Sequence, residues 1–304
     1  MKNRHLEHPE DSILSEGRAG LYDILNYLEN HKNNTLTVKY DGAPAIVWGI
    51  NPENGKFFVG TKSVFNKVKV KINYTHYDIE VNHGDKPAVA SILHMCLEKL
   101  PRVEGVYQGD FIGYGGGKEY TPNTITYKFD DVVEEDIIVA AHTTYTGDTI
   151  KDMCASYGCE PIASEEVRFL DTSATVNYRN YRIGLYIAAA RVAAKWVTFP
   201  TEEKGRQLKT YINSYIRMGL PIDAQKIAKE TGCHVGLIQL YNFLTEIKEM
   251  IMEGVRSNED ITCFIGDKKS DHEGFVLSNK YGTCKLVNRE QFSYANFNSD
   301  KWDK

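Results

Sequence analysis

Lys39-Tyr40-Asp41-Gly42 closes a short β-like run, residues 35–40, and is followed by a second, apolar run, residues 43–49. A lysine at the end of a strand is held in place and its charge can be tuned by neighbouring groups, which suits a covalent catalyst. The glycine that follows the acid lets a ligand approach the backbone closely. The alternative is a surface hairpin with a solvated lysine, and four residues alone do not separate the two.

The composition is that of an ordinary globular protein. Of 304 residues, 42% are hydrophobic and 25% are charged, so the chain is long enough to bury a full core. The N-terminus has no apolar signal stretch, and no run approaches the roughly 18 apolar residues of a membrane span. The six cysteines form no C-x-x-C pair, so we expect reduced thiols. We therefore expect a cytoplasmic monomer without a membrane partner, in the host cytoplasm if a phage encodes it.

The periodicity of apolar residues changes along the chain. It predicts helices at 17–31 and 87–100 and a short helix at 149–157. The strand-like runs are 35–40, 44–50, 56–61, 104–113, 123–129, 136–143, 261–265, 274–278 and 282–287. Between 178 and 256 β-like alternation disappears, and prolines separate three or four helices. The pattern predicts an α+β domain, residues 1–177 and 257–304, interrupted by an all-helical insertion, residues 178–256.

The helical insertion is basic within an acidic chain. Between Arg179 and Lys229 there are ten basic residues and three acids, whereas the whole chain has a net charge of −5. This asymmetry indicates either a local site for polyanions or a solvated helical face. Residues 222–240 have the rhythm of a helix-turn-helix, which is also that of a plain helical hairpin. We expect non-specific phosphate contacts rather than base reading, from Arg179, Arg182, Arg206 and Lys209.

Further chemistry-bearing residues follow Lys39 in a fixed order, each at or near a predicted strand. They are Lys62 in Gly-Thr-Lys-Ser, Asp110 in Tyr-Gln-Gly-Asp-Phe, Glu273 in Glu-Gly-Phe-Val-Leu, and Lys285 in Lys-Leu-Val. Each piece alone is weak evidence. A lysine, a cation, two carboxylates and a second lysine in this order form a strong joint pattern.

On these motifs the chain resembles the covalent nucleotidyltransferase superfamily, which includes ATP-dependent DNA and RNA ligases and mRNA capping enzymes. Lys39-Tyr-Asp-Gly matches the K-x-D-G motif, and Glu273-Gly-Phe-Val matches the E-G-x-V motif. Lys62 resembles the basic residue that follows the nucleophile, and Lys285 resembles the final lysine. In Tyr127-Lys-Phe-Asp, we take Phe129 as the ring that stacks on the purine, with Tyr127 as the alternative.

The resemblance implies a nucleotidyltransferase (adenylation) fold of antiparallel sheets flanked by helices. It implies that Lys39 attacks the α-phosphate of ATP to form a lysyl-AMP intermediate, with Lys285 as the second catalytic residue. The residues that it assigns to nucleotide binding are Val38, Tyr40, Asp41, Gly42, Lys62, Asp110, Phe129 and Glu273. Asp110 and Glu273 would hold Mg²⁺, with Mn²⁺ as an alternative.

Two residues depart from the family pattern. Asp110 stands where the family has glutamate, and Thr283 stands where it has a lysine, for which Lys280 could substitute. Nineteen residues follow Lys285, too few for the C-terminal OB domain of DNA ligases and capping enzymes. The resemblance therefore implies an RNA-ligase-like enzyme.

The implied activity is that of an ATP-dependent polynucleotide ligase, which joins 5′-phosphate and 3′-hydroxyl ends in RNA or seals nicks in DNA or RNA. The sequence leaves RNA against DNA, and ATP against GTP, open. One alternative is an enzyme that only transfers AMP or GMP to an acceptor. The other is a non-catalytic nucleic-acid-binding protein on a degenerate ligase scaffold.

The chain also resembles proteins of tailed phages that share the start His5-Leu-Glu-His8-Pro-Glu-Asp. The sequence does not assign a role to this start. His5 and His8 would either contact the nucleotide or be ordinary surface histidines.

Overall fold

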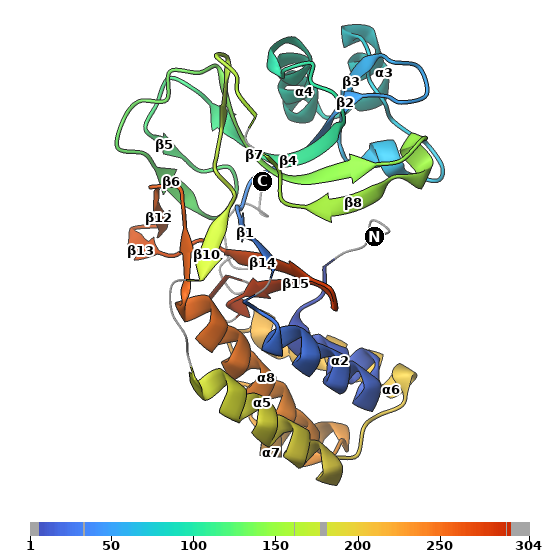
Figure 1. The fold of residues 1–304 in the computed structure, drawn as a ribbon, viewed down its shortest axis with the longest axis vertical. Helices are drawn as coiled ribbons and strands as arrows, with labels where there is room; N and C mark the ends of the chain where they lie inside the picture. Colours follow the sequence, from blue (N-terminus) through green and yellow to red (C-terminus); the bar gives the residue numbers. More distant parts are fainter. Residues whose placement is uncertain (1–5, 33, 161, 177–180, 290, 293–304) are drawn as a thin grey trace. The chain divides into compact units, whose positions relative to one another are not determined.

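The computed structural model describes residues 6–32, 34–160, 162–176, 181–289 and 291–292. The chain forms two compact units, each built from segments that are distant in the sequence. The first unit comprises the described residues of Tyr40–Ser173 and Ser257–His272, and the second those of His5–Lys39, Ala174–Arg256 and Glu273–Lys304. Both contain helices and antiparallel sheets, which confirms the α+β class (Figure 1).

The main sheet of the first unit has six strands. They are β2 (Ala45–Ile50), β3 (Phe57–Gly60), β4 (Val106–Tyr114), β7 (Ile137–Thr146), β8 (Cys154–Tyr157) and β9 (Val167–Phe169). The order is β3-β2-β4-β7-β8, and β9 also pairs with β7. All of these pairs are antiparallel except β7–β9, which is parallel. Predicted strands 44–50, 56–61, 104–113 and 136–143 therefore form in this sheet.

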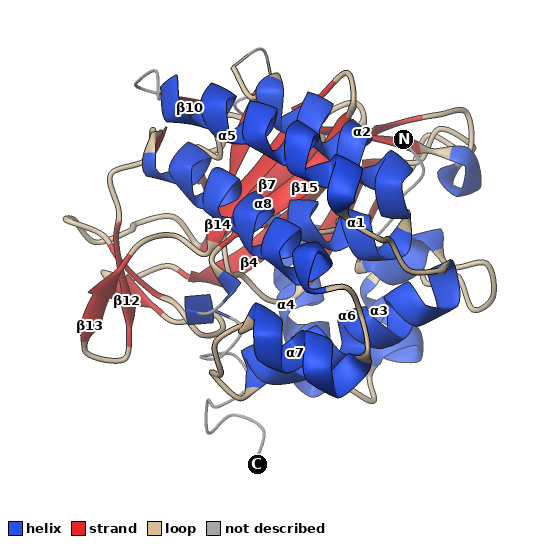
Figure 2. Ribbon diagram, turned by 90° about the horizontal axis from the view of Figure 1, so that it is seen from below, coloured by secondary structure: helices blue, strands red, loops and turns tan. Residues whose placement is uncertain are grey.

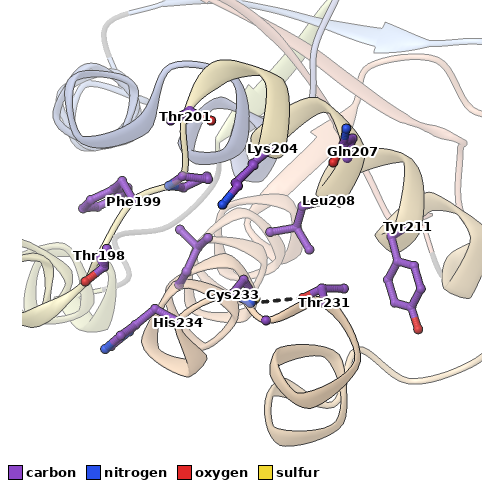
Figure 3. Close-up of a pocket in the computed structure, with 13 residues that line it drawn as sticks. Thr198, Phe199, Thr201, Lys204, Gln207, Leu208, Tyr211, Thr231, Cys233 and His234 are labelled. Atoms are coloured by element: carbon purple, nitrogen blue, oxygen red, sulfur yellow. Dashed lines mark hydrogen bonds between the residues drawn. The ribbon is translucent and has the colours of Figure 1, made fainter.

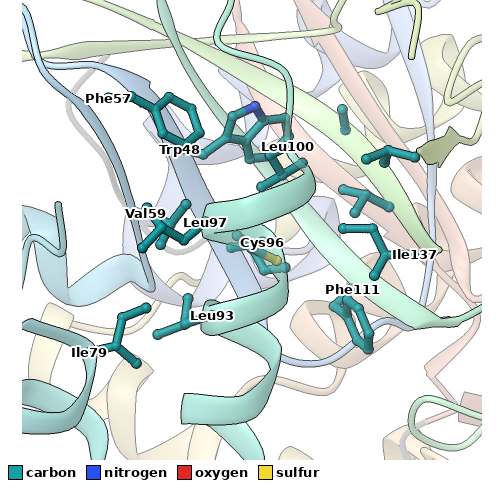
Figure 4. Packing of buried hydrophobic residues seen from close by; sticks show 14 of the residues in the cluster. Trp48, Phe57, Val59, Ile79, Leu93, Cys96, Leu97, Leu100, Phe111 and Ile137 are labelled. Atoms are coloured by element: carbon teal, nitrogen blue, oxygen red, sulfur yellow. The ribbon is translucent and has the colours of Figure 1, made fainter. Parts of the chain in front are cut away.

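Helix α4 (Pro87–Lys99) covers one face of this sheet and builds its core. Its apolar side chains Leu93 and Leu97 face Trp48 and Val59 of β2 and β3, all buried (Figure 4). Helix α3 (His76–His83) lies beside α4 and adds Ile79 to the same cluster. The opposite face is covered by the short 3-10 turns η2 (Lys62–Phe65) and η3 (Ile150–Asp152).

The predicted helix at 149–157 is wrong. Only the turn η3 forms there, and the chain continues as β8, which pairs with the long strand β7. Met153 and Ala155 are buried in the core on that face of the sheet. Pairing with an available strand edge thus overrides the local preference of a short segment.

A smaller sheet completes the first unit. Its order is β13-β12-β6-β5, formed by β5 (Glu119–Tyr120), β6 (Thr126–Lys128), β12 (Thr262–Ile265) and β13 (Lys268–Ser270). Strands β6 and β12 lie far apart in the sequence and pair antiparallel. The strand that the sequence predicts at 261–265 is therefore confirmed.

The second unit packs helices against a three-stranded antiparallel sheet in the order β1-β14-β15. The strands are β1 (Thr35–Lys39), β14 (Gly274–Asn279) and β15 (Gly282–Val287). Figures 1 and 2 show the helices gathered beside this sheet. They are α1 (Ser12–Ser15), α2 (Gly17–Glu29), α5 (Tyr181–Ala193), α6 (Glu202–Arg217), α7 (Ala224–Thr231) and α8 (Val235–Glu253). Smaller elements are the turns η1 (Pro9–Asp11) and η4 (Ala194–Trp196) and the strand pair β10 (Ala174–Val176) and β11 (Val255–Ser257).

The helices α5–α8 occupy the stretch that the sequence predicts to be helical. The sequence also predicts that residues 178–256 form an insertion in the α+β domain. These helices share a compact unit with β1, β14 and β15. Helix α2 contacts α5, and the Tyr27 hydroxyl of α2 donates to the Leu277 carbonyl of β14 at 2.6 Å. Among the described helices, none is long and apolar enough to cross a membrane.

Candidate functional site

Lys39 and Glu273 meet at one end of the β1-β14 pair. Lys39 is the last residue of β1 and lies opposite Gly274, the first residue of β14. The Lys39 ammonium donates a hydrogen bond to Glu273 Oε2 and forms an ion pair with it. The side chain of Lys39 is 32% exposed and that of Glu273 is 12% exposed. The pair is thus shielded on the carboxylate side and open to solvent on the amine side.

Gly274 is required by the close approach of two strands. A Cβ atom at this position would lie 2.1 Å from the carbonyl oxygen of Leu286 in β15. The glycine of the E-G-x-V motif therefore allows β14 to pair closely with β15 immediately after Glu273. Val38, also assigned to nucleotide binding, is buried in β1 opposite Phe275 and forms part of the core.

Lys285 lies on β15, the third strand of the same sheet. It pairs with Val276, which in turn pairs with Thr37. Because residues two apart on a strand share a face, Lys285 and Lys39 point to the same face of the sheet. Burial and the charge of Lys39 lower the pKa of Lys285, against the opposing effect of Glu273. The sheet therefore presents two lysines on a common face, and one of them, Lys39, is paired with the Glu273 carboxylate.

Thr283 and Lys280 have other contacts. The Thr283 hydroxyl lies 2.8 Å from that of its strand partner Ser278. Lys280 lies in the turn after β14, at the opposite end of that strand from Glu273, and its ammonium lies 5.0 Å from the centre of the Tyr281 ring. Lys280 is therefore not a substitute for the missing motif lysine.

Asp41 ties together a loop of the first unit. Its carboxylate accepts hydrogen bonds from the Asn123 side chain at 2.8 Å and from the backbone N–H groups of Thr124 and Ile125 at 2.8 and 3.1 Å. Its own N–H donates to the Tyr127 hydroxyl at 2.6 Å. With 7% of its surface exposed, Asp41 acts as a structural acceptor. Sequence reasoning missed Asn123, because an asparagine in a turn is common and does not indicate a hydrogen bond to Asp41.

Gly42 is packed against Asp110 of β4. A Cβ on Gly42 would lie 2.6 Å from the Cβ of Asp110, so only glycine fits. The Asp110 carboxylate lies 3.6 Å from His142 Nε2 on the neighbouring strand β7. His142 is a second residue that sequence reasoning missed, because a single histidine within a strand carries no signal.

Tyr40, Tyr127 and His272 form an aromatic cluster in the first unit. The Tyr40 ring centre lies 5.6 Å from that of Tyr127 and 5.3 Å from that of His272. Burial lowers the pKa of His272 to about 4, so the imidazole is neutral at physiological pH. Burial also raises the pKa of Tyr40.

Phe129 and Lys62 lie apart from this cluster. Phe129 is buried against Tyr120, with ring centres 5.6 Å apart. Of the two rings predicted to stack on the purine, Tyr127 is the one whose hydroxyl accepts a hydrogen bond from the Asp41 N–H. Lys62 is exposed at the start of η2. Asp110 and Lys62 belong to the first unit, and Lys39, Glu273 and Lys285 to the second.

The N-terminal stretch carries a network of buried ion pairs in the second unit. Lys248 of α8 donates to Glu10 at 2.8 Å, and the two side chains are 0% and 1% exposed. Arg289 donates to Asp11 at 2.9 Å. Burial lowers the pKa of His8, and Arg289 and Lys285 add to this effect. His8 is therefore a neutral histidine with 12% of its side chain exposed; His5 lies outside the described residues.

The basic residues proposed to contact nucleic acid have different surroundings. Lys209 forms ion pairs with Glu7 and with Asp11, the latter at 3.3 Å; burial opposes its charge, but these acids outweigh it and raise its pKa. Arg206 is exposed, 3.8 Å from Glu202. Arg182 is exposed, with its guanidinium 5.9 Å from the centre of the Tyr186 ring. Arg179 lies outside the described residues.

Comparison with protein families gives a match over residues 3–235 and 223–301 to a family described as a family of unknown function (DUF6267). No curated protein and no solved structure matches the chain. The matched residues include both the K-x-D-G and the E-G-x-V motifs. Because the match covers most of its length, the chain belongs to the family of unknown function DUF6267.

Proposed function

We propose that this protein is an ATP-dependent polynucleotide ligase of the RNA-ligase-like kind, with a nucleotidyltransferase (adenylation) fold and a lysyl-AMP intermediate on Lys39. One observation carries the proposal. Lys39 and Glu273, 234 residues apart and each in its own motif, form an ion pair at the junction of two strands. Lys285 of the final motif lies on the same face of that sheet as Lys39.

The arrangement supports attack by the Lys39 amine on the α-phosphorus of ATP. The nitrogen lone pair forms the N–P bond while the bond from phosphorus to the bridging oxygen breaks, and pyrophosphate leaves with that electron pair. Glu273 Oε2, which accepts from the Lys39 ammonium, would take the proton that the amine must lose. The Lys285 cation would stabilise the charge that builds up on the α-phosphate.

The carboxylate oxygens of Glu273 and Asp110 are suitable ligands for a hard divalent cation such as Mg²⁺. Within the described residues, no group of three or more His, Cys, Asp or Glu side chains is arranged to hold a metal ion. Magnesium in nucleotide enzymes is held by one or two carboxylates together with substrate phosphates, so a complete protein cage is not required. We therefore retain Glu273, beside Lys39, as a proposed ligand. Asp110 belongs to the other unit, and its role as a ligand stays a prediction from the sequence. Bound magnesium would neutralise phosphate charge.

The test is intact-protein mass spectrometry after incubation with Mg²⁺ and ATP or GTP. We expect the wild-type protein to gain the mass of one AMP, and Lys39→Arg to gain none. Arginine keeps the positive charge beside Glu273 but is not a nucleophile, because its guanidinium stays protonated. An equal gain in Lys39→Arg, or no gain in folded wild type with either nucleotide, would reject the proposal.

Product analysis then identifies the acceptor. With a 5′-phosphorylated strand and a 3′-hydroxyl strand, a ligase consumes the adduct and yields a joined strand. An enzyme that only transfers AMP stops at the capped 5′ end. Joining in the wild type and its absence in Lys39→Arg would support the ligase.

A further inference from the structure

The indole ring of Trp196 is exposed on a backbone turn whose position is fixed by hydrogen bonds. Its surface is 80% exposed, although it ends the short turn η4 between two buried residues, Ala194 and Val197. Arg18 of α2 donates to the carbonyls of Ala194 at 2.7 Å and Val197 at 3.1 Å. Arg18 therefore fixes the backbone of the turn, while the indole ring is exposed to solvent. A ring on a fixed backbone loses little conformational freedom when a ligand stacks on it.

Two neighbouring hollows flank the N-terminus of α8. The first, of about 380 Å³, is lined by Trp196, Phe243 and His234 among others. The second, of about 510 Å³, is lined by His234, Lys204 and Tyr211 among others (Figure 3). Because His234 lines both, they form one surface, which we call the Trp196 surface. Each has the size of a small-ligand site, about 300–1,000 Å³.

The charge of the Trp196 surface is suited to an anion. Among the described residues that line the two hollows, none is acidic. The whole chain has 41 acids and a net charge of −5, so a lining without an acid differs from the overall composition. Lys204 lines the second hollow, and Lys195 precedes Trp196; both are exposed. The nearest acids in the sequence are Glu202 and Glu203 in the first turn of α6, and Glu230, next to Thr231. Arg206 faces Glu202, and Glu230 accepts a hydrogen bond from the Tyr211 hydroxyl.

We propose that the Trp196 surface binds single-stranded polynucleotide, with one base stacked on Trp196 and phosphates contacted by Lys195 and Lys204. This rests on the proposed ligase function and narrows its substrate to unpaired ends. An exposed ring beside cations is the usual platform for single strands, because every base has a face to stack. Inside a duplex both faces of each base are covered by neighbouring bases, so internal paired bases cannot stack on the ring. Lys209, whose ammonium is held by Glu7 and Asp11, is then a structural residue.

The experiment measures binding without ATP, by fluorescence anisotropy with a labelled uridine oligonucleotide of about 12 nucleotides, within the range bound by single-strand sites. Loss of one stacked base corresponds to roughly a tenfold weaker affinity or more in Trp196→Ala. Trp196→Phe keeps a ring and should lose less. Leu185→Ala removes another exposed apolar side chain, from α5, and serves as the matched control with unchanged affinity. Lys204→Ala should weaken the salt dependence of binding.

Three results would overturn the inference. The first is an unchanged affinity of Trp196→Ala for the oligonucleotide. The second is a loss of affinity in Leu185→Ala equal to that in Trp196→Ala, which would indicate a general apolar docking surface for protein. The third is binding of a matched duplex as tight as that of the single strand. Adduct formation is measured separately on the wild-type protein without polynucleotide. Trp196-dependent strand binding by a protein that forms no adduct would therefore reject the ligase proposal and still support this surface.

Discussion

At the scale of single residues, a place in a motif does not by itself define a chemical role. Asp41 belongs to K-x-D-G, yet its oxygens accept three hydrogen bonds from residues 123–125 and hold a loop. Lys39, two residues earlier, is the one whose amine is open to solvent and paired with a carboxylate. The motif thus combines a reactive group with a structural support that follows it directly.

His272 gives a pH dependence of stability at the same scale. Its folded pKa of about 4 lies below the usual 6.5, so between these values the unfolded chain takes up a proton that the folded protein does not. Stability is complete above pH 6.5 and is lost as the pH falls towards 4. At 1.36 kcal/mol per pKa unit, the loss from pH 7 to pH 5 is about 2 kcal/mol.

Urea unfolding of the wild-type protein and His272→Phe at both pH values measures this contribution. Phenylalanine keeps a ring beside Tyr40 and Tyr127 but does not titrate. We expect a smaller loss of stability in His272→Phe. Other buried histidines with lowered pKa values, such as His31 and His83, contribute equally to both proteins. The same pH dependence in the two proteins would show that His272 is not neutral and buried.

At the scale of elements, the β1-β14-β15 sheet fixes the geometry of the site. Gly274 allows β14 to approach β15 closely, and its register with Lys39 sets Glu273 beside the amine. We expect Gly274→Ala to lower the unfolding free energy by about 2 kcal/mol or more, because the new Cβ would overlap the Leu286 carbonyl. Adduct formation should fall with it, since Glu273 would move.

Gly184→Ala in α5 is the control for this substitution. Among the described residues, no atom beyond the neighbouring backbone of α5 lies within 4 Å of the point that an alanine Cβ would occupy. Alanine should therefore raise stability by about 0.5–1 kcal/mol through its higher helix propensity. Chemical denaturation measures both variants. A Gly274→Ala protein as stable and active as the wild type would contradict the account of this strand contact.

At the scale of the whole second unit, buried charges link three distant segments. Glu10 and Asp11 come from the N-terminal segment, Lys248 from α8, and Arg289 from the stretch after β15. This gives the Pro-Glu-Asp part of the N-terminal stretch a structural role that the sequence left open. Breaking one buried pair leaves an uncompensated charge, whereas removing both partners does not.

We therefore expect Lys248→Met and Glu10→Leu each to lower the unfolding free energy by about 3–5 kcal/mol. The double variant should lose less than the sum, because both partners are removed together, and Arg289, 3.7 Å from Glu10, keeps its ion pair with Asp11. A double-mutant cycle by urea unfolding measures the coupling. Strictly additive losses would show that Lys248 and Glu10 do not stabilise the unit as a pair.

The sequence was sufficient to predict an element where its local apolar pattern agrees with the way the element packs in the fold. Helices α2 and α4, the strands that carry Lys39 and Lys285, and the strand that follows Glu273 agree with the apolar pattern of the sequence. The sequence was not sufficient where contacts between distant segments decide. Strand β8 forms because β7 offers an edge, and the contact of Asp41 with the Tyr127 hydroxyl joins residues 86 apart in the sequence. The grouping of α5–α8 with the N-terminal segment depends on contacts over long sequence distances.

The central claim is that Lys39 carries the nucleotide, and peptide mapping tests it most directly. The ATP-treated protein is digested, and tandem mass spectrometry locates the AMP group on the sequence. We predict AMP on Lys39 and none on Lys62 or Lys285. AMP on another lysine, or on no residue of the folded protein, would contradict the account.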